Sequence, residues 1–202
     1  MNSKNFGLNV EDVYLNEVDF PIIRENFIVI SGCSGGGKSS LLSELALRGY
    51  SVVPEPGRQI VKEQTVIGGE ALPWINLQKF LELALSRYLF QYNSQKEQHE
   101  YVFFDRGIVD AVLIDQYQSK CFKRAAEKFR YHRIVFLVPP WKEIFVTDME
   151  RKHDFDAAKK EFDELLIKYK KFGYEIVLLP KLSVQERADY ILQRLDTNHK
   201  NM

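Results

Sequence analysis

A glycine-rich stretch in the first quarter of the chain has the residue types and spacing needed to bind a polyphosphate. Residues 32–39 read Gly-Cys-Ser-Gly-Gly-Gly-Lys-Ser, the pattern G-x-x-x-x-G-K-S of a P-loop. Glycines let backbone N–H groups converge on phosphate oxygens, Lys38 reaches the β- and γ-phosphates, and the Ser39 hydroxyl is placed to hold Mg²⁺. The expected nucleotide-binding residues are Gly32, Ser34, Gly35, Gly36, Gly37, Lys38, Ser39 and Ser40. The sequence therefore predicts a site for a nucleoside triphosphate with Mg²⁺.

A second candidate is an acidic residue at the end of an apolar segment. Asp105 ends the run Tyr-Val-Phe-Phe-Asp, and a carboxylate beside the P-loop strand can hold Mg²⁺ directly or through water. The alternative is an N-cap or turn aspartate, since Gly107 follows. Motor ATPases usually place a glutamate directly after this aspartate, whereas this chain has Arg106. We therefore expect phosphate transfer to a bound acceptor, in which Arg106 holds an anionic group.

Glu55 and Arg58 lie in the segment Pro-Glu-Pro-Gly-Arg, just beyond a short predicted strand. Open α/β sheets bind ligands at the carboxyl ends of their strands. A carboxylate there can orient an acceptor hydroxyl or take its proton, and Arg58 can bind the same substrate. The alternative is a surface Glu–Arg pair, which contributes little stability.

The segment 141–156 is polar and aromatic and follows the fourth predicted strand, where P-loop kinases carry a lid. An arginine of a lid stabilises the negative charge that develops on a transferred phosphoryl group. Arg151 is the candidate for this role. The alternative is a solvated charge cluster, because Glu150 and Asp154 flank it.

The elements that must position these residues alternate along the chain. Apolar runs typical of buried parallel strands occur at 26–31, 51–53, 101–105, 133–138 and 175–179. Helices are predicted at 38–48, 59–64, 74–95, 110–118, 122–129, 156–172 and 184–195, with a loop at 65–72. This alternation predicts a three-layer α/β P-loop fold: a sheet of about five mainly parallel strands, helices on both faces and a small lid.

Two helices carry more specific expectations. Ser183 and Glu186 form a capping-box pattern for the final helix. The helix at 74–95 has an apolar face that we expect to be core, made of Trp74, Leu77, Leu81, Ala84, Leu85, Tyr88 and Tyr92.

The expected domain plan is an N-terminal arm at 1–25, a nucleotide-binding domain at 26–196 with its lid at 141–156, and a tail at 197–202.

The composition of the chain limits the kinds of partner that we expect it to bind. The 202 residues include 28 Lys or Arg and 28 Asp or Glu, so the zero net charge gives no electrostatic case for nucleic acid. The two cysteines cannot form a disulfide framework, and no apolar stretch is long enough to span a bilayer. The N-terminal residues Met-Asn-Ser-Lys-Asn-Phe lack the apolar core of a signal peptide. We expect a cytoplasmic protein that binds a nucleotide and a small molecule without a membrane; the oligomeric state is open.

The set of motifs resembles a known family. Residues 25–196 contain G-C-S-G-G-G-K-S-S-L, V-P-E-P-G-R, V-F-F-D-R-G-I-V-D, V-P-P-W-K-E-I-F, D-M-E-R and S-V-Q-E-R-A-D-Y-I-L. This combination resembles small P-loop ATPases filed among AAA-type domains, and is similar to nucleoside and nucleotide kinases and to nicotinamide-riboside-kinase-like domains. The resemblance implies that Glu55, Arg58, Asp105 and Arg106 line the acceptor and magnesium site and that Arg151 belongs to the lid.

Three functions compete on this basis. The first is a kinase that transfers the γ-phosphate of Mg·ATP to a nucleoside-like or metabolite-like acceptor, with Lys38, Glu55, Asp105 and Arg151 as catalytic residues. The second is a nucleotide-dependent ATPase or switch that acts on a protein partner, and the third is a binding module without turnover. The absence of an N-K-x-D guanine motif after the P-loop favours ATP over GTP.

Overall fold

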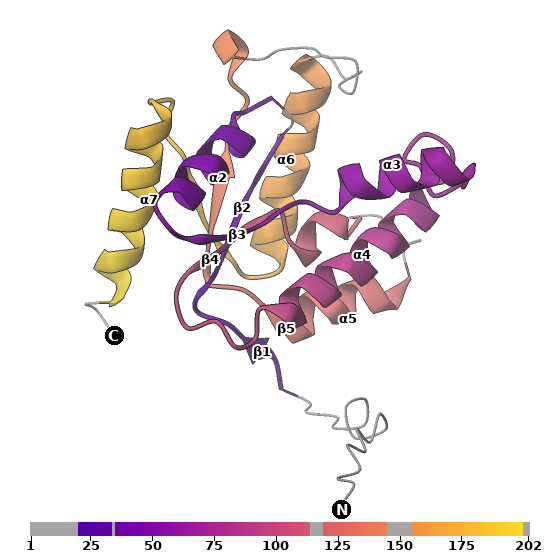
Figure 1. Cartoon of the computed structure of the whole chain (residues 1–202), viewed down its shortest axis with the longest axis horizontal. Helices are drawn as coiled ribbons and strands as arrows, with labels where there is room; N and C mark the ends of the chain where they lie inside the picture. Colours follow the sequence, from indigo (N-terminus) through magenta and orange to yellow (C-terminus); the bar gives the residue numbers. More distant parts are fainter. Residues whose placement is uncertain (1–19, 34, 114–118, 145–154, 200–202) are drawn as a thin grey trace, which may run out of the picture.

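The computed structural model describes residues 20–33, 35–113, 119–144 and 155–199, which fold around a central sheet (Figure 1). Five strands make up the sheet: β2 (Phe27–Gly32), β3 (Ser51–Val53), β4 (Val102–Asp105), β6 (Ile134–Val138) and β7 (Glu175–Leu178). Their order is β3-β4-β2-β6-β7, and every neighbouring pair is parallel. The predicted α/β fold with a five-stranded parallel sheet is confirmed.

Helices cover both faces of the sheet because its strands are apolar on both sides. Phe27 and Val29 of β2 pack into one core cluster, whereas Ile28 and Ile30 pack into another. The first cluster is closed by α4 (Leu77–Ser94), α5 (Lys120–Lys128) and α6 (Phe155–Lys171). The second is closed by α2 (Lys38–Leu47) and α7 (Val184–His199). The result is the predicted three-layer arrangement (Figure 1).

The register of the central strands sets the position of the site. In the parallel pairs Ile30 lies opposite Asp105, and Gly32 lies opposite Val138. The carboxyl ends of β2, β3 and β4 therefore meet at one edge, where the chain continues into the P-loop, Glu55 and Arg106. This is the edge at which open α/β sheets bind ligands.

Helices α3 and α4 differ from the expectation in their bounds. The helix α3 (Gly57–Ile67) extends into the predicted loop and ends at Gly68, whose φ of 66° gives a left-handed C-cap. The helix α4 begins later than predicted, because the Asn76 side chain accepts a hydrogen bond from the backbone N–H of Lys79 and caps it. Trp74 therefore precedes the helix and is 68% exposed, so its assignment to the core was wrong. Leu77, at the first turn, is 44% exposed, so its assignment to the core was also wrong.

Several short elements of the structure were not predicted from the sequence or differ from the prediction. Two-residue strands β1 (Ile22–Ile23) and β5 (Phe129–Arg130) pair in parallel beside the main sheet, and are too short to give a periodic signal. A 3₁₀ helix, η1 (Ile108–Ala111), stands where a helix at 110–118 was predicted, and residues 114–118 lie outside the described part. Of the predicted lid, the described residues form η2 (Lys142–Ile144) and the start of α6, while residues 145–154 lie outside the description.

The capping box of α7 is confirmed. The Ser183 hydroxyl donates to Glu186 Oε2 at 2.6 Å, and the Glu186 backbone N–H donates to Ser183 Oγ at 3.3 Å.

Within the described ranges, no helix is both long enough and apolar enough to cross a membrane.

Gly32 offers a test of the β2–β6 packing. It has a φ of 132°, and a Cβ added there would lie 2.4 Å from the Val138 carbonyl oxygen. Because this neighbour is backbone and cannot rotate away, Gly32→Ala is expected to destabilise the fold by roughly 3 kcal/mol in urea unfolding. Gly49→Ala is the control, since Gly49 also has a positive φ but a Cβ there would meet no atom of the described residues within 4 Å. Equal losses for the two variants would contradict the steric explanation.

Candidate active site

The P-loop places Lys38 at the start of α2. Gly37 adopts a φ of 81° at the helix N-cap, and the Lys38 ammonium donates 2.9 Å hydrogen bonds to the carbonyl oxygens of Gly32 and Cys33. Lys38 is buried, and burial, reinforced by the nearby charge of Arg106, lowers its pKa. Its amine is thus held over the loop by neutral carbonyl groups. Ser34 lies outside the described residues.

An arginine from the C-terminal helix lines the cavity and supports the loop. Arg187 of α7 is 3% exposed, and its Nη1 donates to the carbonyl oxygen of Gly36 at 3.3 Å. The guanidinium lies 5.6 Å from the centre of the Trp141 ring. A Cβ on Gly37 would come within 3.2 Å of the guanidinium nitrogens, so glycine is needed for this close packing. The sequence reasoning missed Arg187, because its only signal was membership of the motif S-V-Q-E-R.

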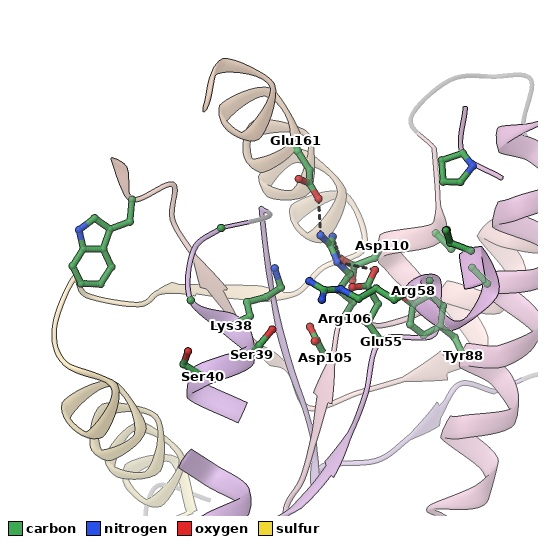
Figure 2. Close-up of a pocket in the computed structure, with 18 of the residues that line it drawn as sticks. Lys38, Ser39, Ser40, Glu55, Arg58, Tyr88, Asp105, Arg106, Asp110 and Glu161 are labelled. Atoms are coloured by element: carbon green, nitrogen blue, oxygen red, sulfur yellow. Dashed lines mark hydrogen bonds and ion pairs between the residues drawn. The ribbon is translucent and has the colours of Figure 1, made fainter. Parts of the chain in front are cut away.

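Ser39 and Asp105 present oxygens to the same part of the cavity as Lys38 (Figure 2). Asp105 Oδ1 is buried and has no hydrogen-bond partner among the residues that the structure describes, which is costly for a carboxylate. Burial raises the pKa of Asp105, and the charge of Lys38 opposes this shift. Mg²⁺ prefers oxygen ligands and is usually held by one or two protein groups together with substrate phosphates. Ser39 and Asp105 fit that ligand set.

Arg106 lies at the centre of three carboxylates (Figure 2). Its guanidinium nitrogens lie 2.6 Å from Glu161 Oε1, 3.2 Å from Asp110 Oδ1 and 3.4 Å from Glu55 Oε1. Although burial acts in the opposite direction, these carboxylates raise the pKa of Arg106 well above its ordinary value. The residue has a φ of 65°, which is rare for a side chain other than glycine and typical of functional sites. The residue directly after β4 is thus strained, and its side chain is held by carboxylates from three separate segments.

Asp110 anchors this cluster. Its carboxylate is 4% exposed and accepts hydrogen bonds from the Ser31 hydroxyl, the Gly107 backbone N–H and the Tyr169 hydroxyl, besides pairing with Arg106. Glu161 comes from α6 and is 37% exposed. Neither acid was singled out in the sequence, because Asp110 stood within a predicted helix and Glu161 within an amphipathic one. The one sequence signal of Asp110 was its place at the end of the motif V-F-F-D-R-G-I-V-D, whereas only contact with Arg106 identifies Glu161.

One cavity of about 1300 Å³ joins these groups. Residues of the P-loop line one end, and Glu55, Arg106 and Asp110 line the other. The wall between α3 and α4 is largely apolar and aromatic, formed by Val61, Pro73, Trp74, Phe80, Leu81, Ala84 and Tyr88. Burial raises the pKa of Tyr88 well above its ordinary value, and nearby Glu55 adds to the shift, so its hydroxyl stays protonated.

The cavity brings most of the predicted site residues together. Its lining includes Gly35, Gly37, Lys38, Ser39, Ser40, Glu55, Arg58, Asp105 and Arg106. Arg58 lies on the exposed first turn of α3. Gly57 allows Glu55 to turn inward, since a Cβ there would lie 3.0 Å from Glu55 Oε1. Gly32 and Gly36 instead pack against β6, and Arg151 lies outside the described residues.

A model for a family described as an AAA domain matches residues 27–187. The match spans more than half of the 202 residues, and the chain belongs to this family. No curated protein matches the chain at a significant level.

Among solved structures, deoxyadenosine kinase from M. mycoides with products dcmp and dcdp has a TM-score of 0.53 and 18% identity, covering 85% of this chain and 98% of that one. The same kinase with bound dATP gives a TM-score of 0.51 at 16% identity, with 84% and 99% covered. Shikimate kinase from Aquifex aeolicus gives 0.51 at 18% identity, with 87% and 99% covered. At these identities the likeness is one of fold.

Asp105 provides a test that separates stability from ligand binding. Replacing this carboxylate, one oxygen of which is buried without a partner among the described residues, with a neutral amide is expected to raise the melting temperature of the ligand-free protein by a few degrees, about 1–2 kcal/mol. Asp105→Asn should also weaken binding of Mg·ATP, while Asp163→Asn, an exposed change on α6, should do neither.

The stability difference between Asp105→Asn and the wild type should depend on pH with a defined sign. Because folding raises the pKa of Asp105, its ionisation destabilises the folded state as pH rises above the ordinary value of 3.8. The stability gained by Asp105→Asn should therefore be present at neutral pH and shrink as pH falls toward that value. Thermal unfolding across this range measures it, and a gain that grows on acidification would contradict the assignment.

Proposed function

We propose that this member of the AAA-domain family is a kinase that transfers the γ-phosphate of ATP to a small acceptor. The size and shape of the cavity carry the proposal. At about 1300 Å³ it exceeds the roughly 300–1,000 Å³ typical of a site for one small ligand. It also continues past the P-loop to Glu55 and the aromatic wall, which leaves room for a second substrate beside a nucleotide.

At the nucleotide end, the P-loop backbone and Lys38 bind the triphosphate. Lys38 exchanges the carbonyl oxygens of Gly32 and Cys33 for phosphate oxygens, which is favourable because its ammonium is already desolvated. Ser39 and Asp105 hold Mg²⁺, and the unpaired Asp105 oxygen supports this role. The bound Mg²⁺ supplies positive charge that offsets the charge developing on the phosphates.

At the acceptor end, Glu55 orients the accepting group and takes its proton. The acceptor oxygen attacks the γ-phosphorus in line with the bond to the β,γ-bridging oxygen. As the new P–O bond forms, that bond breaks and ADP leaves, while the proton passes to the Glu55 carboxylate. Arg58 contacts the acceptor from α3, and Arg151 stabilises the transferred phosphoryl group from the lid.

A nucleotide-dependent switch is the second candidate, and one surface favours it. Val66, Ile67, Trp74 and Ile75 are strongly exposed apolar residues around the connection between α3 and α4, next to the cavity mouth. Exposed apolar surface of this kind can bind a protein partner. A partner retained by the protein with ATP but not with ADP would support this function.

A substrate panel distinguishes turnover from mere binding. Purified protein with Mg·ATP is offered nucleosides, nucleotides, ribosides and vitamins, and both ADP release and phosphorylated product are measured. We expect product from at least one acceptor, and none with Lys38→Ala, since the triphosphate loses its principal cation. Slow ADP release without any phosphorylated product would favour the switch.

Glu55→Gln tests the acceptor end. Loss of the proton acceptor is expected to reduce the transfer rate by roughly 10²–10⁴-fold while ATP affinity changes little. Glu97→Gln is a matched control, because that side chain is 86% exposed and stands apart from the cavity. If Glu55→Gln transfers phosphate at the rate of the control, Glu55 has a structural role.

A further inference from the structure

We propose that the group accepting the phosphoryl in this site is an uncharged hydroxyl rather than a phosphate, and that Glu161 is a specificity-determining residue that keeps anionic acceptors out. The inference rests on the proposed kinase function and adds the class of acceptor. It follows from the charges around the reacting end of the cavity.

The cation that could bind an anionic acceptor is already paired with protein carboxylates. Arg106 is the arginine next to Glu55, and its three contacts are with Glu55, Asp110 and Glu161. A phosphate acceptor would need the guanidinium fork to be available for bidentate contact. Here two of its nitrogens already contact Asp110 and Glu161 at 3.2 and 2.6 Å.

The contact between Arg106 and Asp110 cannot be exchanged cheaply for a contact with a ligand. Asp110 is buried and accepts hydrogen bonds from Ser31, Gly107 and Tyr169, so it is held in place and would lose its cation if Arg106 turned away. A buried charge stripped of its partner costs several kcal/mol in proteins. Arg106 therefore stays with the cluster.

The remaining cations do not reverse the balance. Lys168 is buried behind the cluster, where its ammonium lies 3.5 Å from the Asp110 carbonyl oxygen, and it is not part of the cavity lining. Arg58 and Lys62 line the cavity from the exposed side of α3, where solvent and salt screen their charges. Lys38 and Arg187 also line the cavity, but they contact carbonyl oxygens of the P-loop at its other end, where the charge of Asp105 acts on Lys38. At the reacting end, three carboxylates thus face Arg106 and Lys168, leaving an excess of negative charge.

This balance separates two kinds of acceptor. A phosphate would bring about two negative charges next to the Glu55 carboxylate, and one unit charge at about 5 Å in a partly screened site changes affinity by on the order of a hundredfold. A hydroxyl donates a hydrogen bond to the same carboxylate. In the reaction its oxygen forms the bond to the γ-phosphorus, the bond to ADP breaks, and its proton passes to Glu55.

Glu161 is the residue through which this selectivity can be changed. It is partly exposed on α6, and Arg106 keeps two other carboxylates when its charge is removed. Glu161→Gln therefore removes one negative charge from the cavity without removing a buried group. Glu164→Gln is the matched control, because it makes the same change on the exposed side of the same helix.

The experiment compares ligands in pairs. Nucleosides, ribosides and vitamins, each beside its own phosphate ester, are titrated calorimetrically into the full chain saturated with Mg²⁺ and a non-hydrolysable ATP analogue. In every pair with a binding member, the unphosphorylated compound is expected to bind at least tenfold more tightly. Glu161→Gln should lower this ratio at least threefold, with an unchanged melting temperature, whereas Glu164→Gln should leave it as in the wild type.

The outcomes separate this inference from the kinase proposal. A phosphate ester that binds as tightly as its parent, a ratio unchanged by Glu161→Gln, or no binding by any compound overturns the inference. A product made from a phosphorylated acceptor would leave the kinase standing and overturn the inference. Selective binding of unphosphorylated compounds with no product under Mg·ATP would support the charge selectivity and count against the kinase.

Discussion

The structure depends on one buried carboxylate. Asp110 joins Ser31 at the end of β2, the backbone of Gly107 after β4, Tyr169 of α6 and the guanidinium of Arg106. A carboxylate this deeply buried is tolerated only because donors surround it. Those donors come from three separate segments, so satisfying one charge fixes the end of the P-loop strand, the turn after β4 and a helix relative to one another.

That constraint divides the cavity into two ends of opposite character. The P-loop end has Lys38, the helix N-terminus and closely packed glycines, all suited to phosphate oxygens. The other end has an arginine whose guanidinium lies among three carboxylates, with an aromatic wall beside it. A phosphoryl donor and an uncharged acceptor would be sorted between these ends by electrostatics alone.

Two of the residues proposed to take part in the chemistry are also in energetically unfavourable states in the fold. Asp105 has a buried oxygen with no partner in the described part of the chain, and Arg106 has a backbone conformation that few residues other than glycine adopt. Unfavourable conformations and environments of this kind persist when the surrounding structure imposes them. Here the parallel pairing of β2 with β4 and the contacts around Asp110 impose them. Arg187 completes the support by holding the Gly36 carbonyl oxygen from α7.

Local features of this chain could be predicted from its sequence. The P-loop has fixed spacing, and the apolar runs around it are long enough to indicate buried strands, so the parallel sheet and the positions of Lys38, Ser39 and Asp105 at one edge follow from the pattern. The capping box of α7 could also be predicted, because it depends on two residues three positions apart. Each of these signals lies within a few consecutive residues.

Contacts between distant segments were decided only by the tertiary structure. Asp110 and Glu161 look like ordinary helical acids until folding brings them to Arg106, and Arg187 looks like a surface arginine until α7 packs behind the P-loop. Trp74 matched a helical apolar face, yet the cap at Asn76 placed it at the mouth of the cavity. A motif sets which groups can contact a ligand locally, but the charge that an acceptor meets is a sum over segments joined only by the fold.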